Sequence, residues 1–297
     1  MTHAGASAAA AHRRRLLAVL GLSLAILGIE VAAAVLANSL ALLADAGHML
    51  TDAAGLLMAL LAIWLADRPA TKGRTFGFLR LEVLAAGASA TLLVAVSVFV
   101  LVEAWRRLSA PPEVVSGLML GVALVGLAAN GVSFYLLRDA QGASLNLRGA
   151  YLEVLGDLAG SAAVLVAGAV IALTGWTRAD AVASLVIGLL ILPRTLALLR
   201  QATNVLLEAT PPGIDLDLVR QHICAARGVR DVHDLHAWTI TSGLDVLSAH
   251  VVIGPEVQST QVLDELCHCL SADFDIAHST FQLEREDRSR LEEHAHA

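Results

Sequence analysis

Six long apolar segments occupy most of residues 16–203, and they limit what this chain can fold into more than any other feature of the sequence. A helix needs about 20 apolar residues to cross a hydrocarbon layer about 30 Å thick. The segments that reach this length are residues 16–37, 42–65, 83–104, 115–137, 150–174 and 180–203. Only 16% of the residues are charged, whereas ordinary soluble domains carry about 25%. The sequence therefore predicts an α-helical membrane protein with six transmembrane helices over residues 16–207.

Residues 208–297 have the mixed composition of a soluble domain. This part begins with the helix and strand breakers Thr-Pro-Pro-Gly at 210–213. Beyond them, the hydrophobic pattern predicts helices over 215–227 and 256–270, and strands over 229–240, 244–253 and 279–283. The order αββαβ predicts a small cytoplasmic α+β domain of the ferredoxin-like or metallochaperone-like type over residues 208–285. Residues 1–15 and 286–297 are expected to be an N-terminal tail and a disordered C-terminal tail.

The distribution of basic residues predicts the orientation in the membrane. The first apolar segment follows Arg13–Arg15, as in a secretory signal, but its run is longer than the roughly 7–15 residues of such a signal. We therefore expect it to remain as the first span. Cytoplasmic loops of membrane proteins are enriched in Arg and Lys. With the N-terminus inside, the inner side receives Arg13–Arg15, Arg68, Lys72, Arg74, Arg80, Arg138, Arg148 and Arg200, and the outer side Arg106, Arg107 and Arg178. Both termini are thus expected to be cytoplasmic, in an inner or plasma membrane of bacterial type.

Charge, lysine usage and motif content exclude several classes of function. The net charge of −7 argues against a nucleic-acid-binding protein. Lys72 is the single lysine of the chain and follows Thr71, so the Gly-Lys-Ser/Thr sequence of a phosphate-binding loop is missing, and we expect no nucleotide. The sequence also has no His-Glu-x-x-His motif, which argues against an intramembrane metal-dependent hydrolase, and we expect no enzyme.

The three cysteines, Cys224, Cys267 and Cys269, all lie in the C-terminal part. An odd number of cysteines in a cytoplasmic segment predicts reduced thiols. Cys267 and Cys269 flank His268 and resemble a metal motif, but residues i and i+2 of a helix point about 200° apart. We therefore expect core cysteines here and no shared metal ion.

Two matched pairs of ionisable residues lie within the apolar segments. His48 and Asp52 are spaced i, i+4 and share one helix face, and Glu153 and Asp157 repeat this spacing in the fifth segment. Ionisable groups at membrane depth are costly and point to function. If the two helices face each other, the pairs would supply one imidazole and three carboxylates to a divalent metal ion. The alternative is that these groups are hydrogen-bonded to one another and only hold the bundle together.

Several motifs then resemble one known family in order along almost the whole chain. They are Leu40-Ala-Leu-Leu-Ala-Asp45-Ala-Gly-His48-Met-Leu-Thr-Asp52, Thr75-Phe-Gly-Phe-Leu-Arg80-Leu-Glu82, Asn130, Leu155-Gly-Asp157, Val232-His233-Asp-Leu-His236-Ala-Trp238, Ser248-Ala-His250 and His278-Ser-Thr-Phe-Gln-Leu-Glu284. This set is similar to the cation diffusion facilitators, in the zinc-transporter-like branch. The resemblance implies a homodimeric, proton-coupled exporter of Zn²⁺ or related metals.

The resemblance also implies site residues. The transport site of the family falls on His48, Asp52, Asp157 and position 153, where zinc-transporting relatives usually have His and this chain has Glu153. A carboxylate still binds zinc, but a harder oxygen ligand could widen the substrates toward Cd²⁺, Co²⁺, Fe²⁺ or Mn²⁺. Zn²⁺ is the favoured substrate.

In the soluble domain, the resemblance implies that His233, His250 and Glu284 approach one another and bind a regulatory metal ion. Neighbouring strands bring side chains within about 5 Å, which allows such an approach. The alternative is a set of ordinary surface histidines. His236 lies three positions from His233, so on a regular strand it would face the opposite side.

The sequence therefore predicts a proton-coupled divalent-metal antiporter in which protons and metal compete for the same ligands. The alternative is a membrane-bound metal sensor that binds metal without transporting it. The role of Glu30 in the first span is left open by the sequence, since it either transfers protons or pairs with a polar neighbour. The resemblance also implies that Arg80 and Glu208 form a charged pair near the junction of membrane and soluble domain, which would tie helix motion to the dimer.

Overall fold

The computed structural model describes residues 3–66, 71–138, 145–276 and 278–285. Within them the chain forms two compact units. The first unit combines the chain up to residue 64 with residues 85–199, and the second combines residues 65–84 with the chain from residue 200 onward. Each unit is described by itself.

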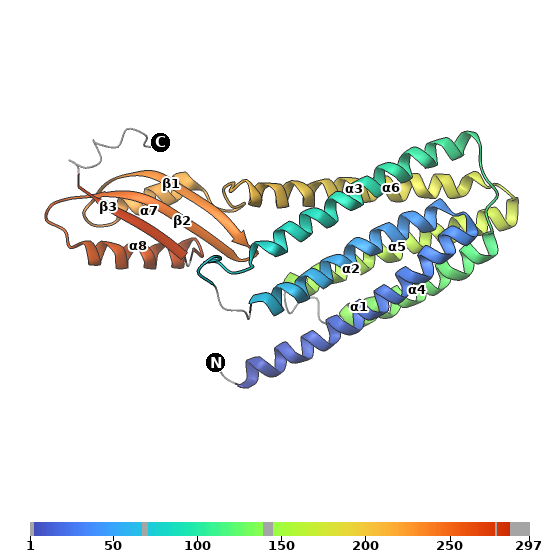
Figure 1. The fold of residues 1–297 in the computed structure, drawn as a ribbon, viewed down its shortest axis with the longest axis horizontal. Helices are drawn as coiled ribbons and strands as arrows, with labels where there is room; N and C mark the ends of the chain where they lie inside the picture. The colour runs from blue at the N-terminus through green and yellow to red at the C-terminus, as the bar shows by residue number, and fades with distance from the viewer. Residues whose placement is uncertain (1–2, 67–70, 139–144, 277, 286–297) are drawn as a thin grey trace. The chain divides into compact units, whose positions relative to one another are not determined.

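The first unit contains most of six long helices, which run side by side as a bundle (Figure 1). They are α1 (His3–Ala37), α2 (Leu40–Ala66), α3 (Arg80–Ser109), α4 (Ser116–Arg138), α5 (Leu145–Thr174) and α6 (Arg178–Leu206). Among the described residues, five of these helices are long and apolar enough to cross a membrane. The sixth, α2, has 27 residues, and its described apolar stretch is Leu40–Thr51. The predicted helical membrane domain is therefore confirmed.

Packing in this bundle is typical of helices in lipid. Large apolar side chains cover its outside, with Leu173 exposed by 86% and Val35 by 73%. Its core instead contains many small side chains, among them Ala37, Ala41 and Ala104. Lipid tails are as apolar as leucine, so transmembrane helices associate through small residues that let their backbones approach closely.

The start of α2 is held by a residue from another helix. Asp180 in the first turn of α6 is 1% exposed, and its carboxylate accepts hydrogen bonds from Ser39 Oγ at 2.6 Å and from the backbone N–H groups of Leu40 and Ala41 at 2.8 and 3.2 Å. The first N–H groups of a helix have no partner within the helix, and a carboxylate there also complements the helix dipole. Asp180 therefore fixes the beginning of the helix that carries His48.

The second unit contains the predicted αββαβ domain. Its elements are α7 (Leu216–Ala225), β1 (Val229–Thr241), β2 (Leu244–Ile253), α8 (Ser259–Asp273) and β3 (His278–Glu284). The sheet has the order β1-β2-β3, with β1 antiparallel and β3 parallel to β2 (Figure 1). The order of elements matches the prediction, although α8 begins and ends three residues later than expected. Asp215 caps α7 by accepting from the N–H groups of Asp217 and Leu218.

One face of this sheet forms the core with the two helices. Leu247, Ala249 and Val251 of β2 are buried together with side chains of α7 and α8. Because side chains alternate along a strand, Ser248 and His250 face the other side. That second face carries the candidate metal ligands.

Residues 71–84 belong to the same unit and contact the αββαβ domain. Arg80 Nη2 donates to Glu208 Oε1 at 2.7 Å, which confirms the predicted charged pair. The Glu82 carboxylate accepts hydrogen bonds from the hydroxyls of Thr241 and Ser242 at the tip of the β1–β2 hairpin. The start of α3 is therefore bonded to the soluble domain at two points.

Candidate metal sites

The bundle brings one residue of each predicted intramembrane pair together. His48 of α2 and Asp157 of α5 lie with Nε2 and Oδ1 3.5 Å apart, and both side chains are 12% exposed. Gly156 lies beside this pair, since a Cβ atom at that position would lie 4.0 Å from His48 Nε2, an ordinary van der Waals contact. Helices α2 and α5 therefore face each other at the level that the repeated spacing predicted.

Asp52 and Glu153 belong to the same helices, but their side chains lie outside the described residues. The helical spacing alone places Asp52 one turn from His48 and Glu153 one turn from Asp157. Their role as metal ligands stays a prediction.

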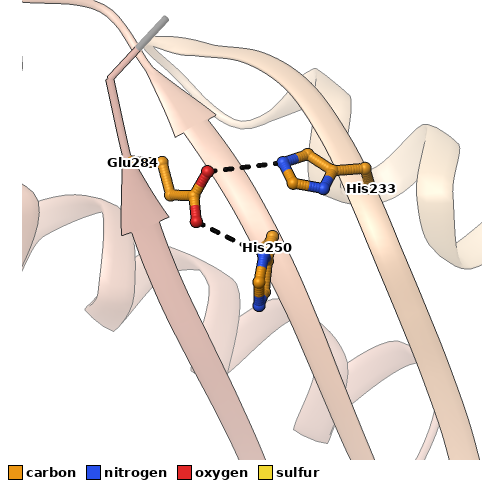
Figure 2. Close-up of side chains that lie close together, drawn as sticks. All are labelled: His233, His250 and Glu284. Carbon is orange, nitrogen blue, oxygen red and sulfur yellow. Dashed lines mark ion pairs between the residues drawn. The ribbon is translucent and has the colours of Figure 1, made fainter. Parts of the chain in front are cut away.

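The second site lies on the sheet face that the helices leave uncovered. His233 of β1, His250 of β2 and Glu284 of β3 point toward one another (Figure 2). His233 Nε2 lies 3.4 Å from Glu284 Oε2, and His250 Nδ1 lies 3.3 Å from Glu284 Oε1. Glu284 is the buried member, with a side chain exposed by 0%. The three residues thus converge from all three strands of the sheet.

These distances fit a metal ion. In a tetrahedral zinc site with bonds of about 2.0–2.1 Å, two ligand atoms lie about 3.3–3.4 Å apart. The two nitrogen–oxygen distances around Glu284 are of this length. Gln282 Nε2 also donates a hydrogen bond to Glu284 Oε1 and so orients the carboxylate. Two imidazoles and one carboxylate are a common ligand set for zinc.

An irregularity in β1 produces this arrangement. His233 pairs with His250 and His236 pairs with Ser248, so the two β1 residues between them are opposed to the single β2 residue Ala249. The extra residue forms a bulge, at which Asp234 has a φ of +47°. The expectation that His236 faces away from His233 is wrong, since their partners Ser248 and His250 lie on one face. His236 is nevertheless exposed and lies outside the cluster.

The bulge also places a fourth candidate ligand that the sequence analysis missed. Asp234 Oδ2 lies 3.9 Å from His250 Nδ1, and the Asp234 side chain is 19% exposed. On a regular strand Asp234 would face away from its neighbour His233. A positive φ is uncommon for a non-glycine residue and often marks a functional position. The sequence shows no signal for this bulge.

Cys267 and Cys269 differ from their predicted location. Cys267 is exposed and Cys269 is half-buried, so the expectation that these two belong to the core is wrong. The Sγ atoms of Cys267 and Cys269 contact different residues, Ser279 and Asp273. Partial burial, together with the nearby Asp273 carboxylate, raises the pKa of the Cys269 thiol and favours its protonated form. Since metal binding needs the thiolate, this environment disfavours a metal ligand.

Comparisons with known proteins match both parts of the chain. Residues 16–207 match the family model described as the cation efflux transmembrane domain, and residues 211–286 match the model of the cation efflux protein cytoplasmic domain. The chain is 46% identical over 233 residues to the metal cation efflux system protein CzcD of Cupriavidus metallidurans, covering 77% of this chain and 73% of that protein. It is 41% identical over 231 residues to the zinc transporter ZitB of Escherichia coli, with 77% and 74% covered.

Two further relatives are similar. The chain is 36% identical over 236 residues to the cadmium, cobalt and zinc/H⁺–K⁺ antiporter of Bacillus subtilis, with 78% and 76% of the two chains covered. A solved structure of the metal-bound C-terminal domain of the CzcD transporter from Cupriavidus metallidurans is 44% identical, covers 24% of this chain and 99% of that one, and has a TM-score of 0.23. The matches show a multi-pass membrane protein with a cytoplasmic C-terminal domain, as predicted.

Proposed function

Because the chain belongs to the cation efflux family, we propose that it is a homodimeric, proton-coupled antiporter that exports Zn²⁺ from the cytosol. The observation that carries the proposal is the approach of His48 and Asp157 within an apolar helix bundle. An imidazole and a carboxylate are both zinc ligands. The names of the relatives support the substrate, since ZitB is a zinc transporter and the Bacillus subtilis protein is a cadmium, cobalt and zinc antiporter.

The proposed transport site consists of His48, Asp52, Glu153 and Asp157. His48 Nε2 and Asp157 Oδ1 are 3.5 Å apart, close to the separation of two ligands on one zinc ion. Asp52 and Glu153 would complete the set from the next turns of the same helices. Because Glu153 supplies oxygen where relatives usually have imidazole nitrogen, we propose a substrate range that extends from Zn²⁺ toward Cd²⁺, Co²⁺, Fe²⁺ and Mn²⁺.

Proton coupling follows from the chemistry of these ligands. A carboxylate or imidazole must lose its proton before it binds a metal ion, so metal and protons compete for the site. In the inward-facing state, metal displaces protons. In the outward-facing state, the higher proton concentration displaces metal. A membrane potential of 100 mV adds about 2.3 kcal/mol for each elementary charge that crosses, and helices rocking around a central site would alternate its access.

We propose that the cytoplasmic domain senses metal at His233, His250 and Glu284 and dimerises. The match to the cytoplasmic domain of cation efflux proteins supports this role. A metal ion would replace the contacts between these three side chains and stabilise the pairing of the three strands. The Arg80–Glu208 ion pair and the Glu82 hydrogen bonds would pass this change to α3.

The test is metal flux into proteoliposomes with and without a pH gradient. Zn²⁺, Cd²⁺, Co²⁺, Ni²⁺, Fe²⁺ and Mn²⁺ would be offered in parallel to the wild type, to Asp157→Ala and to Glu153→His. Glu113→Gln serves as a matched control, because Glu113 is an exposed carboxylate outside the proposed site. Zn²⁺ flux that follows the proton gradient and is lost in Asp157→Ala supports the antiporter.

Two outcomes would change the proposal. Normal flux in Asp157→Ala would remove the proposed transport site. Metal binding without flux of any metal would favour a membrane-bound sensor, a function that the His233–His250–Glu284 cluster by itself would support. A shift of preference toward Zn²⁺ in Glu153→His would identify position 153 as the selectivity residue.

A further inference from the structure

A second group of polar side chains is buried close to His48 and Asp157. It comprises Glu30 of α1, Asp45 of α2, Asn130 of α4 and Ser161 of α5, which are 1%, 2%, 5% and 1% exposed. We call these four residues the oxygen cluster. They come from four different helices of the bundle. Polar residues buried within a membrane domain are energetically costly and usually have a function.

The oxygen cluster lies about one helical turn outward from the proposed transport site. Asp45 precedes His48 by three residues on α2, and Ser161 follows Asp157 by four residues on α5. Because α2 and α5 are antiparallel neighbours, both steps lead in the same direction. The C-terminal domain is cytoplasmic, so α6 ends at the cytoplasmic side, and α5 ends and α2 begins at the outer side. A metal ion that leaves His48 and Asp157 outward would next meet this cluster.

Two hydrogen bonds within the oxygen cluster are long. Asn130 Nδ2 donates to Ser161 Oγ at 3.4 Å, and Ser161 Oγ donates to Asp45 Oδ2 at 3.5 Å. Typical O–H···O bonds are about 2.7–2.8 Å. Glu30 Oε2 is buried without a hydrogen-bond partner among the described residues. Buried polar atoms are nearly always paired, so the Glu30 carboxylate has an oxygen atom available to a ligand.

Glycines make room for the carboxylates. A Cβ atom at Gly126 of α4 would lie 3.0 Å from Glu30 Oε1 and 3.3 Å from Ser161 Oγ, and one at Gly160 of α5 would lie 2.5 Å from Asp45 Oδ1. A Cβ atom at Gly121 or Gly131 of α4 would have no neighbouring heavy atom within 4 Å. A Cβ atom at Gly126 or Gly160 would therefore crowd the oxygen atoms of the cluster, and a larger residue there would displace them.

The charge of the cluster indicates that it binds a cation. Burying a carboxylate in hydrocarbon is costly unless a positive charge compensates it. Among the residues that the structure describes, Glu30 forms no ion pair with Lys, Arg or His. Two carboxylates and a hydroxyl supply only oxygen atoms, which are the ligands of harder divalent cations. His48 and Asp157 offer a nitrogen as well, which zinc binds more tightly.

We propose that Glu30, Asp45 and Ser161 form a second binding station for the divalent cation on its way out, with Asn130 orienting the Ser161 hydroxyl. The station rests on the proposed transport function. Passing from a nitrogen-containing site to an oxygen-only one weakens the hold on the ion near the outer face. Release to the outside is thereby made easier without weakening capture from the cytosol.

The test counts metal ions bound to purified full-length protein. Mn²⁺ is the probe, because it prefers oxygen ligands and the free ion is measured directly by its EPR signal. The parent protein carries His233→Ala and His250→Ala, which remove the cytoplasmic cluster. We expect Glu30→Gln, which keeps the side-chain size, to bind one Mn²⁺ fewer per protomer than the parent. Gly126→Ala fills the space beside Glu30 and is expected to lower the affinity for that Mn²⁺ ion at least 10-fold. Gly121→Ala on the same helix is expected to leave Mn²⁺ binding unchanged.

Several results would overturn the station. Equal Mn²⁺ binding in the parent, Glu30→Gln and Gly126→Ala would do so. A variant that changes only proton release, with Mn²⁺ binding unchanged, would also do so, because the cluster would then carry protons only. Asp157→Asn separates the two proposals. Loss of an ion in Asp157→Asn with none lost in Glu30→Gln would leave the transport site standing and remove the station. Full retention in Asp157→Asn with loss in Glu30→Gln would remove the transport site and keep the station. Thermal unfolding of each variant checks that it is folded.

Discussion

The two candidate metal sites use similar ligands but are built in different ways. His48 and Asp157 lie on two helices, and each has its predicted companion one turn away on the same helix. His233, His250 and Glu284 come from three strands, and no two of them are close in the sequence. The intramembrane site therefore depends on helix spacing and on two helices facing each other. The cytoplasmic site depends on strand register and on one bulge.

Their surroundings also differ. In the bundle, few charged groups compete for a cation, so each carboxylate has a large effect on binding. In the cytoplasmic domain, charged residues are common, and solvent reaches His233 and His250 in part. The comparison predicts that single substitutions will be most damaging in the membrane, and four experiments test that ranking.

The largest effect is expected for Asp157→Asn. The substitution removes a negative ligand but keeps the side-chain volume, so we expect Zn²⁺ flux to fall by about 100-fold or more, since even residues behind the ligands cost about 10–100-fold. Stopped-flow measurements in proteoliposomes compare the Zn²⁺ flux of this variant with that of the control Glu113→Gln. A loss of less than a few-fold would show that Asp157 is not a ligand.

A smaller effect on transport is expected for His250→Ala. The substitution leaves two of the three ligands in the cytoplasmic cluster, so metal affinity there should fall on the order of 100-fold, while flux at saturating metal persists. Isothermal titration of the full-length protein measures the affinity. His268→Ala removes an exposed histidine of α8 and should change nothing. Equal affinities for the two variants would exclude His250 as a ligand.

Asp234→Asn should have a weaker effect on the same site. Asp234 Oδ2 lies 3.9 Å from His250 Nδ1, so its charge should support a bound cation without being one of the three closest groups. We expect the affinity to fall about 3- to 10-fold, less than for a ligand. The same titration compares it with Asp264→Asn, which changes an exposed carboxylate of α8. If Asp234→Asn matches His250→Ala, Asp234 is a full ligand of the ion.

The smallest effect is expected for Arg80→Ala. The ion pair with Glu208 is short, but the two side chains are 38% and 57% exposed, and such pairs contribute about 0.2–1 kcal/mol because water and salt screen them. We expect the dimer dissociation constant to rise only about 2- to 5-fold, and less at high salt. Analytical ultracentrifugation at two salt concentrations, with Arg106→Ala as the control, checks this. An unchanged dissociation constant at low salt would separate this ion pair from dimerisation.

Much of the fold followed from local pattern. The apolar segments predicted the helices of the bundle, and the alternation of apolar residues predicted the order αββαβ, because both patterns report which face of an element is buried. The family and the class of protein, a transporter and not an enzyme, are confirmed by the matches. Element ends were less accurate. Helix α8 is displaced by three residues, since the segment before it carries no strong cap.

The sequence by itself determined the spacing of His48 with Asp52 and of Glu153 with Asp157, because a helix repeats every 3.6 residues whatever surrounds it. Only the tertiary structure decided which residues meet across elements. The bulge at Asp234 reversed the face of His236, and the packing of four helices brought Glu30, Asp45 and Ser161 together around two glycines. Neither the bulge nor this cluster is indicated by the nearby sequence, since each depends on how closely one backbone can approach another.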